Sequence, residues 1–192
     1  MQIRLFVQVP LNIGQTISLS DEQVHYLRNV LRCEPGIEVY LFNGQDGEYT
    51  GVLSALSKKE AIVQVCRQLK KQPEKQNIHL FFAPLKRDCS ELVVQKATEL
   101  GVTKITPVLT EYTSNKHINL DRFKSIVLES CEQCRRLDVP ELGQMVDLKT
   151  LLSEYDESKP MLVHLDETGQ GQKAEVVFKG KKEIAFLTGP EG

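Results

Sequence analysis

The sequence predicts a two-part α/β protein, in which a small β-barrel with one helix precedes a domain built on a mostly parallel sheet. Three observations lead to this fold class. Segments of strand type dominate residues 1–69, the stretch 70–77 has no apolar side chain other than one proline, and strands alternate with helices across residues 78–192.

The composition is that of an ordinary globular protein: of 192 residues, 41% are hydrophobic and 26% are charged. No apolar run approaches the roughly 20 residues of a membrane span, and the first residues lack the core of a signal peptide. We therefore expect a cytoplasmic protein without a membrane partner. The net charge of -2 provides no global basic field, so contact with nucleic acid would depend on local patches.

The first part contains four segments rich in β-branched and aromatic residues, at 3–9, 38–44, 47–56 and 61–69. One helix interrupts them between residues 21 and 32. Ser20 can cap this helix. Its apolar face is expected to hold Val24, Leu27, Val30 and Leu31. Several short strands with a single helix indicate a small barrel.

The second part follows the polar linker at residues 70–77. Its expected strands are 78–84, 104–110, 160–167 and 183–189, and its expected helices are 89–100, 120–137 and 147–155. This alternation implies a mostly parallel sheet, in which ligands bind at the carboxyl ends of the strands. Here these ends carry His164 and Leu165 on one strand and the segment from Leu187 to Gly192 on another.

Cys131 and Cys134 have the spacing of a metal or redox pair. No second cysteine pair and no nearby histidine pair accompanies them, and they lie inside a helix rather than at its start. The odd total of five cysteines also argues against a full disulfide framework. We therefore expect two small packed side chains and no metal site.

Two groups of basic residues have both a structural and a functional interpretation. His25, Arg28 and Arg32 recur at helical spacing, which predicts either a solvated face or a phosphate-contacting stripe that includes Arg4. Arg136 lies at the end of the long helix, where a cation suits the helix dipole or reaches into a site. Spacing does not separate these alternatives.

Five stretches carry a family resemblance in their order: HYLRNVLR, PGIEVYLFNG, VVQKATELGVTKITPVLTE, SCEQCRR with VPEL, and LTGPEG. Together they resemble the bacterial 16S ribosomal RNA uridine N3 methyltransferases of the SPOUT superfamily over nearly the whole chain. The resemblance implies a PUA-like β-barrel at residues 1–69 that helps to hold RNA. It also implies a SPOUT-type α/β domain at residues 78–192, whose deep trefoil knot binds S-adenosylmethionine within a homodimer.

The implied reaction is S-adenosylmethionine-dependent methylation of the N3 atom of a uridine in 16S ribosomal RNA of the small subunit. Because N3 carries a proton near neutral pH, the transfer needs a proton acceptor or a cation that stabilises the deprotonated base. Arg136 is the catalytic candidate, either as this cation or as a contact to the phosphate. The candidate cofactor-binding residues are His164, Leu165, Leu187, Thr188, Gly189, Pro190, Glu191 and Gly192. The candidate RNA-binding residues are Arg4, His25, Arg28, Arg32 and Lys86.

The chain departs from the family pattern in four places, which include Tyr112, where arginine is common, and a shorter stretch from Thr113 to Ser130. Arg135 stands where the family usually has glycine. The family also continues beyond LTGPEG with a segment that threads the knot, so the resemblance predicts that the knot is incomplete in this chain. Two other functions stay open: a non-catalytic RNA-binding module, and an α/β enzyme acting on a small nucleotide. Binding of the cofactor separates the methyltransferase from the RNA-binding module.

Overall fold

The computed structural model describes residues 2–113, 116–156, 158–165, 168–181 and 183–189, and it divides into two compact units. The first, here called the barrel unit, consists of Met1–Glu74 together with Cys131–Asp138. The second, the sheet unit, consists of Lys75–Ser130 together with Val139–Gly192. Within the described part of the chain, no helix is both long and apolar enough to cross a membrane.

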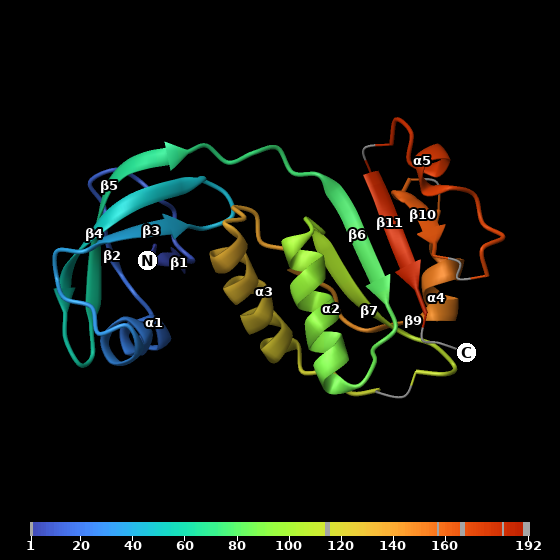
Figure 1. Cartoon of the computed structure of the whole chain (residues 1–192), viewed down its shortest axis with the longest axis horizontal. Helices are drawn as coiled ribbons and strands as arrows, with labels where there is room; N and C mark the ends of the chain where they lie inside the picture. The colour runs from blue at the N-terminus through green and yellow to red at the C-terminus, as the bar shows by residue number, and fades with distance from the viewer. Residues whose placement is uncertain (1, 114–115, 157, 166–167, 182, 190–192) are drawn as a thin grey trace. The chain divides into compact units, whose positions relative to one another are not determined.

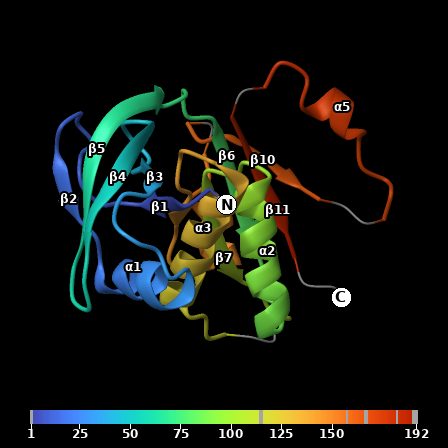
Figure 2. The same cartoon turned by 60° about the vertical axis from the view of Figure 1, so that its left-hand side comes forward.

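The barrel unit is built on one curled five-stranded sheet (Figures 1 and 2). Its strands are β1 (Arg4–Phe6), β2 (Thr16–Ser18), β3 (Glu38–Phe42), β4 (Glu48–Leu56) and β5 (Ala61–Lys70). They lie in the order β1-β3-β4-β5-β2, with β1 and β3 parallel and the other pairs antiparallel. Three register shifts between β4 and β5 increase the local twist and help the sheet to curl. The predicted barrel is confirmed, whereas the short strand β2 was not predicted.

Alternation along the strands builds the core of this unit. On β3, Val39 and Leu41 are fully buried, and on β5 Ala61 and Val63 are fully buried, because every second side chain of a strand points to the same face. Leu27 of the helical segment closes the core from outside the sheet. The strands that the sequence predicted at 38–44 and 61–69 therefore provide much of this core.

The predicted helix at residues 21–32 forms as two pieces, α1 (Asp21–His25) and the π-helix η1 (Tyr26–Val30). Ser20 caps α1 through a capping box with Gln23, as the sequence indicated. The predicted apolar face is wrong at Val30, which is 59% exposed. Leu31 N donates to Tyr26 O at 3.0 Å, and this wider turn rotates Val30 away from the core.

The sheet unit contains a parallel sheet with the strand order β10-β11-β6-β7-β8, and β9 also pairs with β7. Its strands are β6 (Asn77–Phe82), β7 (Lys104–Leu109), β8 (Glu141–Leu142), β9 (Val146–Asp147), β10 (Met161–His164) and β11 (Glu183–Thr188). Its helices are α2 (Arg87–Glu99), α4 (Leu148–Ser153) and α5 (Ala174–Val177), with the first part of α3 (Leu120–Cys134). The predicted mixed α/β fold with a mostly parallel sheet is confirmed.

Helices cover both faces of this sheet. Phe81 and Phe82 are neighbours on β6 and so point to opposite faces. Phe82 faces Phe123 of α3, with ring centroids 6.4 Å apart, while Phe81 shares a cluster with Leu151 of α4 and Val108 of β7. Figure 1 shows α2 alongside α3 on the first of these faces. The loops that could bind a ligand therefore lie at the ends of the strands rather than on the faces of the sheet.

The long helix α3 begins and ends at identifiable signals. Asn119 accepts a hydrogen bond from Arg122 N at 3.0 Å, as an N-cap residue does. The helix stops at Cys134, three residues before its predicted end, because Arg135 takes a left-handed φ of 61°. The segment Cys131–Asp138 then belongs to the barrel unit, although its sequence position suggested the second domain.

Candidate functional site

The carboxyl edge of the parallel sheet gathers most of the candidate cofactor-binding residues. His164 of β10 lies opposite Leu187 of β11, and Thr188 lies opposite Phe82 of β6. Because the strands are parallel, all these residues stand at one edge of the sheet. Pro190, Glu191 and Gly192 lie outside the described residues.

Backbone hydrogen bonds hold the loops that leave this edge. Leu165 N donates to Leu187 O at 3.0 Å, and Ala83 N donates to Thr188 O at 3.1 Å. Gly189 follows directly and is exposed. Among the described residues, no atom would lie within 4 Å of a Cβ atom added at Gly189, and its φ lies outside the left-handed region. The described part of the fold therefore leaves room for a ligand to approach this backbone closely.

The side chains at this edge suit a ligand with an apolar ring and polar groups. Leu165 is 50% exposed. Leu187 is partly buried against the cluster that contains Phe81 and Val108. Apolar surface beside free backbone groups is the usual lining of a cofactor site.

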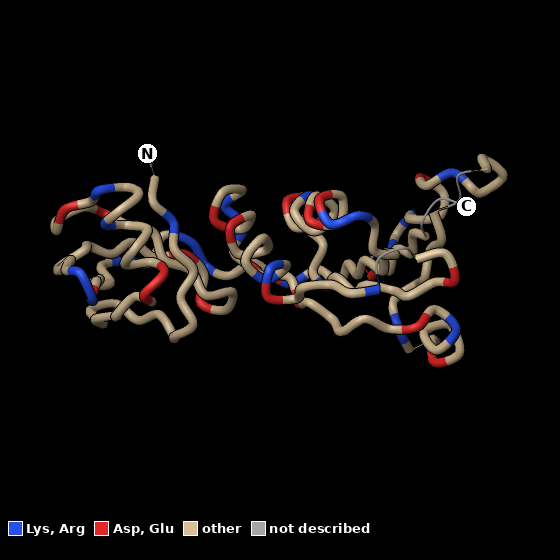
Figure 3. Tube along the Cα trace, turned by 90° about the horizontal axis from the view of Figure 1, so that it is seen from below, with Lys and Arg blue, Asp and Glu red and all other residues tan. Residues whose placement is uncertain are grey.

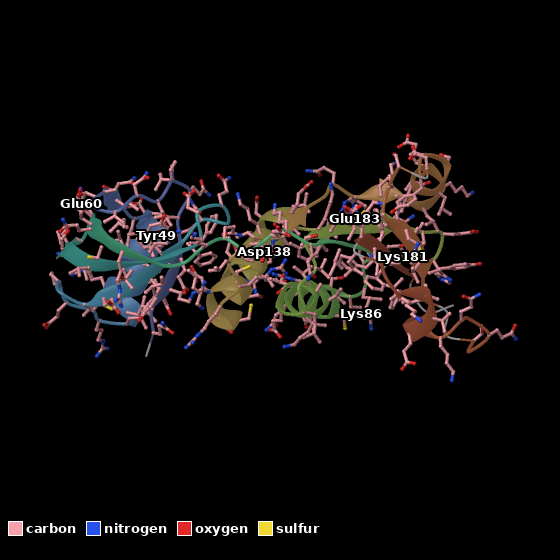
Figure 4. All side chains as sticks on the ribbon, turned by 90° about the horizontal axis from the view of Figure 1, so that it is seen from above. Tyr49, Glu60, Lys86, Asp138, Lys181 and Glu183 are labelled. Atoms are coloured by element: carbon pink, nitrogen blue, oxygen red, sulfur yellow. The ribbon has the colours of Figure 1, made fainter. Side chains whose placement is uncertain are left out.

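Lys86 adds a cation at the same edge of the sheet. It follows β6 and occupies the N-cap position of α2, where it is exposed (labelled in Figure 4). The buried Ser90 hydroxyl holds the loop by accepting from Leu85 N at 2.9 Å and donating to Leu85 O at 3.1 Å. The loop is therefore fixed while the Lys86 side chain faces solvent.

The barrel unit carries a separate feature, a groove of about 500 Å³ that is here called the basic groove. It is lined by Asp21, Val24, His25, Arg28, Asn29, Lys58 and Lys59. One wall is the α1–η1 segment, and the other is the turn between β4 and β5. Three cations face a single carboxylate, so the groove is locally positive although charges of both signs are distributed along the chain (Figure 3).

Lys58 and Lys59 were not among the residues predicted from the sequence. Ser57 Oγ accepts hydrogen bonds from Lys59 N at 3.2 Å and Glu60 N at 3.1 Å, which fixes the turn with both lysines at its tip (Figure 4 labels Glu60). The paired lysines in a turn were the available signal. Only the folded sheet brings this turn next to Arg28, 30 positions earlier in the chain.

Arg4 and Arg32 do not line the basic groove. Arg32 is exposed with a left-handed φ of 53°, immediately beyond the helical segment. Arg4 is only 5% exposed, and its guanidinium donates to Glu48 Oε1 at 2.7 Å and to backbone carbonyls of the barrel unit. We correct the expectation for Arg4, because a buried guanidinium with protein acceptors is not presented to phosphate.

Arg136 is held by a short-range ion pair. Its Nε and Nη2 atoms donate to the two carboxylate oxygens of Asp138 at 3.0 and 2.5 Å, and its side chain is 9% exposed. This fork geometry orients the guanidinium rather than leaving it on a solvated face. The burial and the pairing with Asp138 are sufficient for a structural role, and the catalytic role of Arg136 stays a prediction.

Cys131 and Cys134 do not behave as a reactive pair. Cys131 is fully buried, and this burial raises the pKa of its thiol to about 12. Cys134 is exposed, and both cysteines are free. Among the described residues, no three histidine, cysteine, aspartate or glutamate side chains gather as they would around a metal ion. Packing accounts for Cys131 without redox chemistry, whereas the expectation that Cys134 is also packed is wrong, because its side chain is exposed.

A further pocket, of about 720 Å³, lies away from the candidate site. Tyr155, Lys159, Lys181 and Glu183 are among the residues that line it, at the start of β10 and β11 (Figure 4 labels Lys181 and Glu183). That is the amino edge of the parallel sheet, opposite the edge at which such sheets bind ligands. Its size alone does not make it the functional site.

Comparison with known proteins gives two matches to domain families. The RNA methyltransferase domain matches residues 72–192, and the RNA methyltransferase PUA domain matches residues 19–66. A ribosomal RNA small subunit methyltransferase E of Rickettsia conorii is 29% identical over 193 residues, covering 98% of this chain and 78% of that protein.

Two solved structures are similar over almost the whole chain. One is a ribosomal RNA small subunit methyltransferase E of Neisseria gonorrhoeae bound to S-adenosylmethionine, with a TM-score of 0.87, 27% identity, and coverage of 99% of this chain and 80% of that one. The other is a methyltransferase of Legionella pneumophila in complex with S-adenosylmethionine, with a TM-score of 0.87, 31% identity, and coverage of 100% and 81%.

Proposed function

Because the chain belongs to the RNA methyltransferase family, we propose that it methylates ribosomal RNA of the small subunit with S-adenosylmethionine as methyl donor. The observation that carries this proposal is the likeness, over nearly the whole chain, to two proteins solved with S-adenosylmethionine. The open backbone at Gly189, on the carboxyl edge of the sheet, supports the same cofactor.

We propose the N3 atom of a uridine in 16S ribosomal RNA as the methyl acceptor, as the family resemblance implies. S-adenosylmethionine, when bound, supplies an electrophilic methyl group. N3 must lose its proton as the new bond forms, and it lies on the Watson–Crick edge, so the base must be unpaired. The Arg136 guanidinium, oriented by Asp138, is our candidate for stabilising the negative charge on the base.

The residues present at the carboxyl edge of the sheet fit the cofactor. Leu165 and Leu187 would offer apolar contact for its adenine ring, and the exposed backbone at Gly189, next to the half-buried Thr188, would offer polar groups at close range. His164 stands beside Leu187 in the register and completes this set. Pro190, Glu191 and Gly192 remain candidates by the resemblance alone.

We assign the RNA substrate to two surfaces. The basic groove in the N-terminal domain, which we place at residues 1–69, would contact phosphates through His25, Arg28, Lys58 and Lys59. In the domain that we place at residues 78–192, Lys86 would contribute a further cation. Arg32 remains a candidate outside the groove. As in the resembling family, we expect the complete protein to be a homodimer, which sedimentation would detect.

The cofactor assignment predicts that Gly189→Ala lowers the affinity for S-adenosylmethionine about tenfold while leaving the melting temperature unchanged. The added methyl group meets no atom of the described residues and needs no left-handed φ, so we expect the ligand rather than the fold to oppose it. Calorimetric titration measures the affinity, and thermal unfolding measures the stability.

Gly180→Ala provides a matched control with the opposite pattern. Gly180 has a φ of 74° at the amino edge of the sheet, so alanine should lower the melting temperature and leave cofactor affinity unchanged. Equal affinities of wild type and Gly189→Ala would remove Gly189 from the cofactor site. A folded full-length protein that binds no S-adenosylmethionine would favour the non-catalytic RNA-binding module instead.

The RNA assignment predicts a change in salt dependence. Replacing Arg28, Lys58 and Lys59 with glutamine should weaken binding of a 16S ribosomal RNA fragment and flatten the plot of log affinity against log salt, by about 0.7 for each phosphate that the variant no longer neutralises. Lys149→Gln, on the exposed surface of α4, is the control and should keep the wild-type slope. An unchanged slope in the triple variant would mean that these cations face solvent only.

A further inference from the structure

The buried Arg4 side chain joins two distant parts of the chain within the barrel unit. Its Nε donates to Glu48 Oε1 at 2.7 Å, with side-chain exposures of 3% and 5%. The guanidinium also lies 4.3 Å from the centroid of the Phe42 ring. A buried arginine that loses one of these partners would keep an uncompensated charge, so its geometry is strongly constrained.

The remaining nitrogens of Arg4 point at the end of α3. Nη1 donates to Cys131 O at 2.6 Å and to Glu132 O at 3.2 Å, and Nη2 donates to Arg136 O at 3.2 Å. The last carbonyls of a helix have no partner within the helix and carry its negative dipole end. A buried cation at this position therefore both satisfies these carbonyls and fixes the direction of the chain.

A second contact joins β1 to the segment Cys131–Asp138, and here the segment provides the side chain and β1 provides the backbone group. Phe6 N, on the edge strand of the sheet, donates to Glu132 Oε1 at 3.0 Å. Arg4, Glu48, Glu132 and Phe6 N thus form a set of contacts that we call the clasp. These contacts explain why the segment Cys131–Asp138 is part of the barrel unit, while its neighbours on both sides in the sequence belong to the sheet unit.

We propose that the clasp positions Arg136 for methyl transfer, so that Arg4, Glu48 and Glu132 are positioning residues for the reaction. The clasp binds the carbonyl of Arg136, and Asp138 orients its guanidinium, so backbone and side chain are both held. This inference rests on the proposed function, because it assigns Arg136 a role in that reaction. It gives the barrel unit a role in catalysis in addition to its contact with RNA.

The test compares the full-length variants Arg4→Lys and Glu132→Ala with wild type in two measurements. Lysine keeps the charge but loses the fork that reaches several acceptors, and alanine at 132 removes the acceptor for Phe6 N. Amide hydrogen exchange in residues 131–138 should become at least about tenfold faster, while exchange in β3 and β5 stays slow. The kcat for methylation of small-subunit RNA should fall about tenfold to a hundredfold, with RNA affinity within about twofold of wild type.

Two further variants separate positioning from general stability. Glu132→Gln keeps an oxygen acceptor for Phe6 N and should restore most of kcat, and Lys124→Ala, on the exposed surface of α3, should match wild type. Unchanged exchange at 131–138 in Arg4→Lys and Glu132→Ala would overturn the clasp. Faster exchange with unchanged kcat would overturn its role in the reaction. A wild-type protein that methylates no RNA would instead remove the proposed function, while the exchange data would still decide whether the clasp holds the segment.

Discussion

At the scale of single residues, Arg135 carries a conformational cost that its place in the family pattern makes clear. It follows the last residue of α3 with a φ of 61°, a region that non-glycine residues rarely adopt. The resembling family usually has glycine at this position. Arg135 therefore occupies a backbone conformation that favours glycine, immediately before Arg136.

Arg135→Gly should stabilise the protein by about 1 kcal/mol, because glycine adopts the left-handed region without steric strain. For a chain of this size the melting temperature should rise by roughly 2–4 °C. Gly101→Ala is the opposite control, since Gly101 has a φ of 99° after α2, and it should lower the melting temperature. Thermal unfolding of both variants provides the comparison, and a lower melting temperature for Arg135→Gly would contradict the interpretation of strain.

At the scale of the elements, the pair β6 and β7 holds a histidine in its neutral form. His79 pairs in register with Lys104, its ring stacks on Phe81 at 3.8 Å, and its Nε2 lies 2.8 Å from Thr106 Oγ1. Burial, and secondly the positive charge of Lys104, lower the pKa of His79 to about 4. The sheet therefore makes stability depend on pH.

Wild type should lose stability relative to His79→Gln as the pH falls from about 6.5 to about 4. The unfolded imidazole binds a proton near pH 6.5, but the folded one does so only near pH 4, so between these values the unfolded state holds more protons and acid favours unfolding. Glutamine keeps a polar partner for Thr106 without titrating. Urea unfolding at pH 7, 6 and 5 gives the free energy of unfolding as a function of pH for wild type and for His79→Gln. Equal slopes of these two plots would refute this role of His79.

At the scale of the whole molecule, the barrel unit is assembled from two separate stretches of the sequence. The segment at residues 71–76 has no helix or strand and carries Lys75 on its surface, so trypsin should cut there first. A single cut does not release the barrel, because Cys131–Asp138 stays bound to it through Arg4 and Phe6.

We therefore expect the two fragments of the nicked protein to elute together in gel filtration under native conditions. In Glu132→Ala with Arg4→Lys, the nicked fragments should separate more readily, because hydrogen bonds between the two fragments have been removed. Fragments that separate from nicked wild type without denaturant would show that the segment does not hold the barrel unit together.

The sequence by itself determined the features that local patterns encode. Segments rich in β-branched and aromatic residues predicted β3, β4 and β5, Ser20 predicted the start of α1, and residues 89–100 were predicted as the helix that forms as α2. The ordered motifs predicted the family. Each of these signals is a pattern within a few consecutive residues, or the order of several such patterns along the chain. Such patterns are visible in the sequence without knowledge of the fold.

Only the tertiary structure decided which distant residues meet. Arg4 and Cys131 are 127 positions apart, and the lysines of the β4–β5 turn reach the α1–η1 segment only because the sheet curls. The short elements β2, β8 and α5 were not predicted, since a few residues carry too little pattern and form because neighbours in space complete them. Helical periodicity likewise predicted Val30 on the apolar face, but the π-helix η1 has a wider turn and leaves Val30 exposed. The pairing of residues far apart in the sequence depends on the free energy of the whole fold, which no local pattern contains.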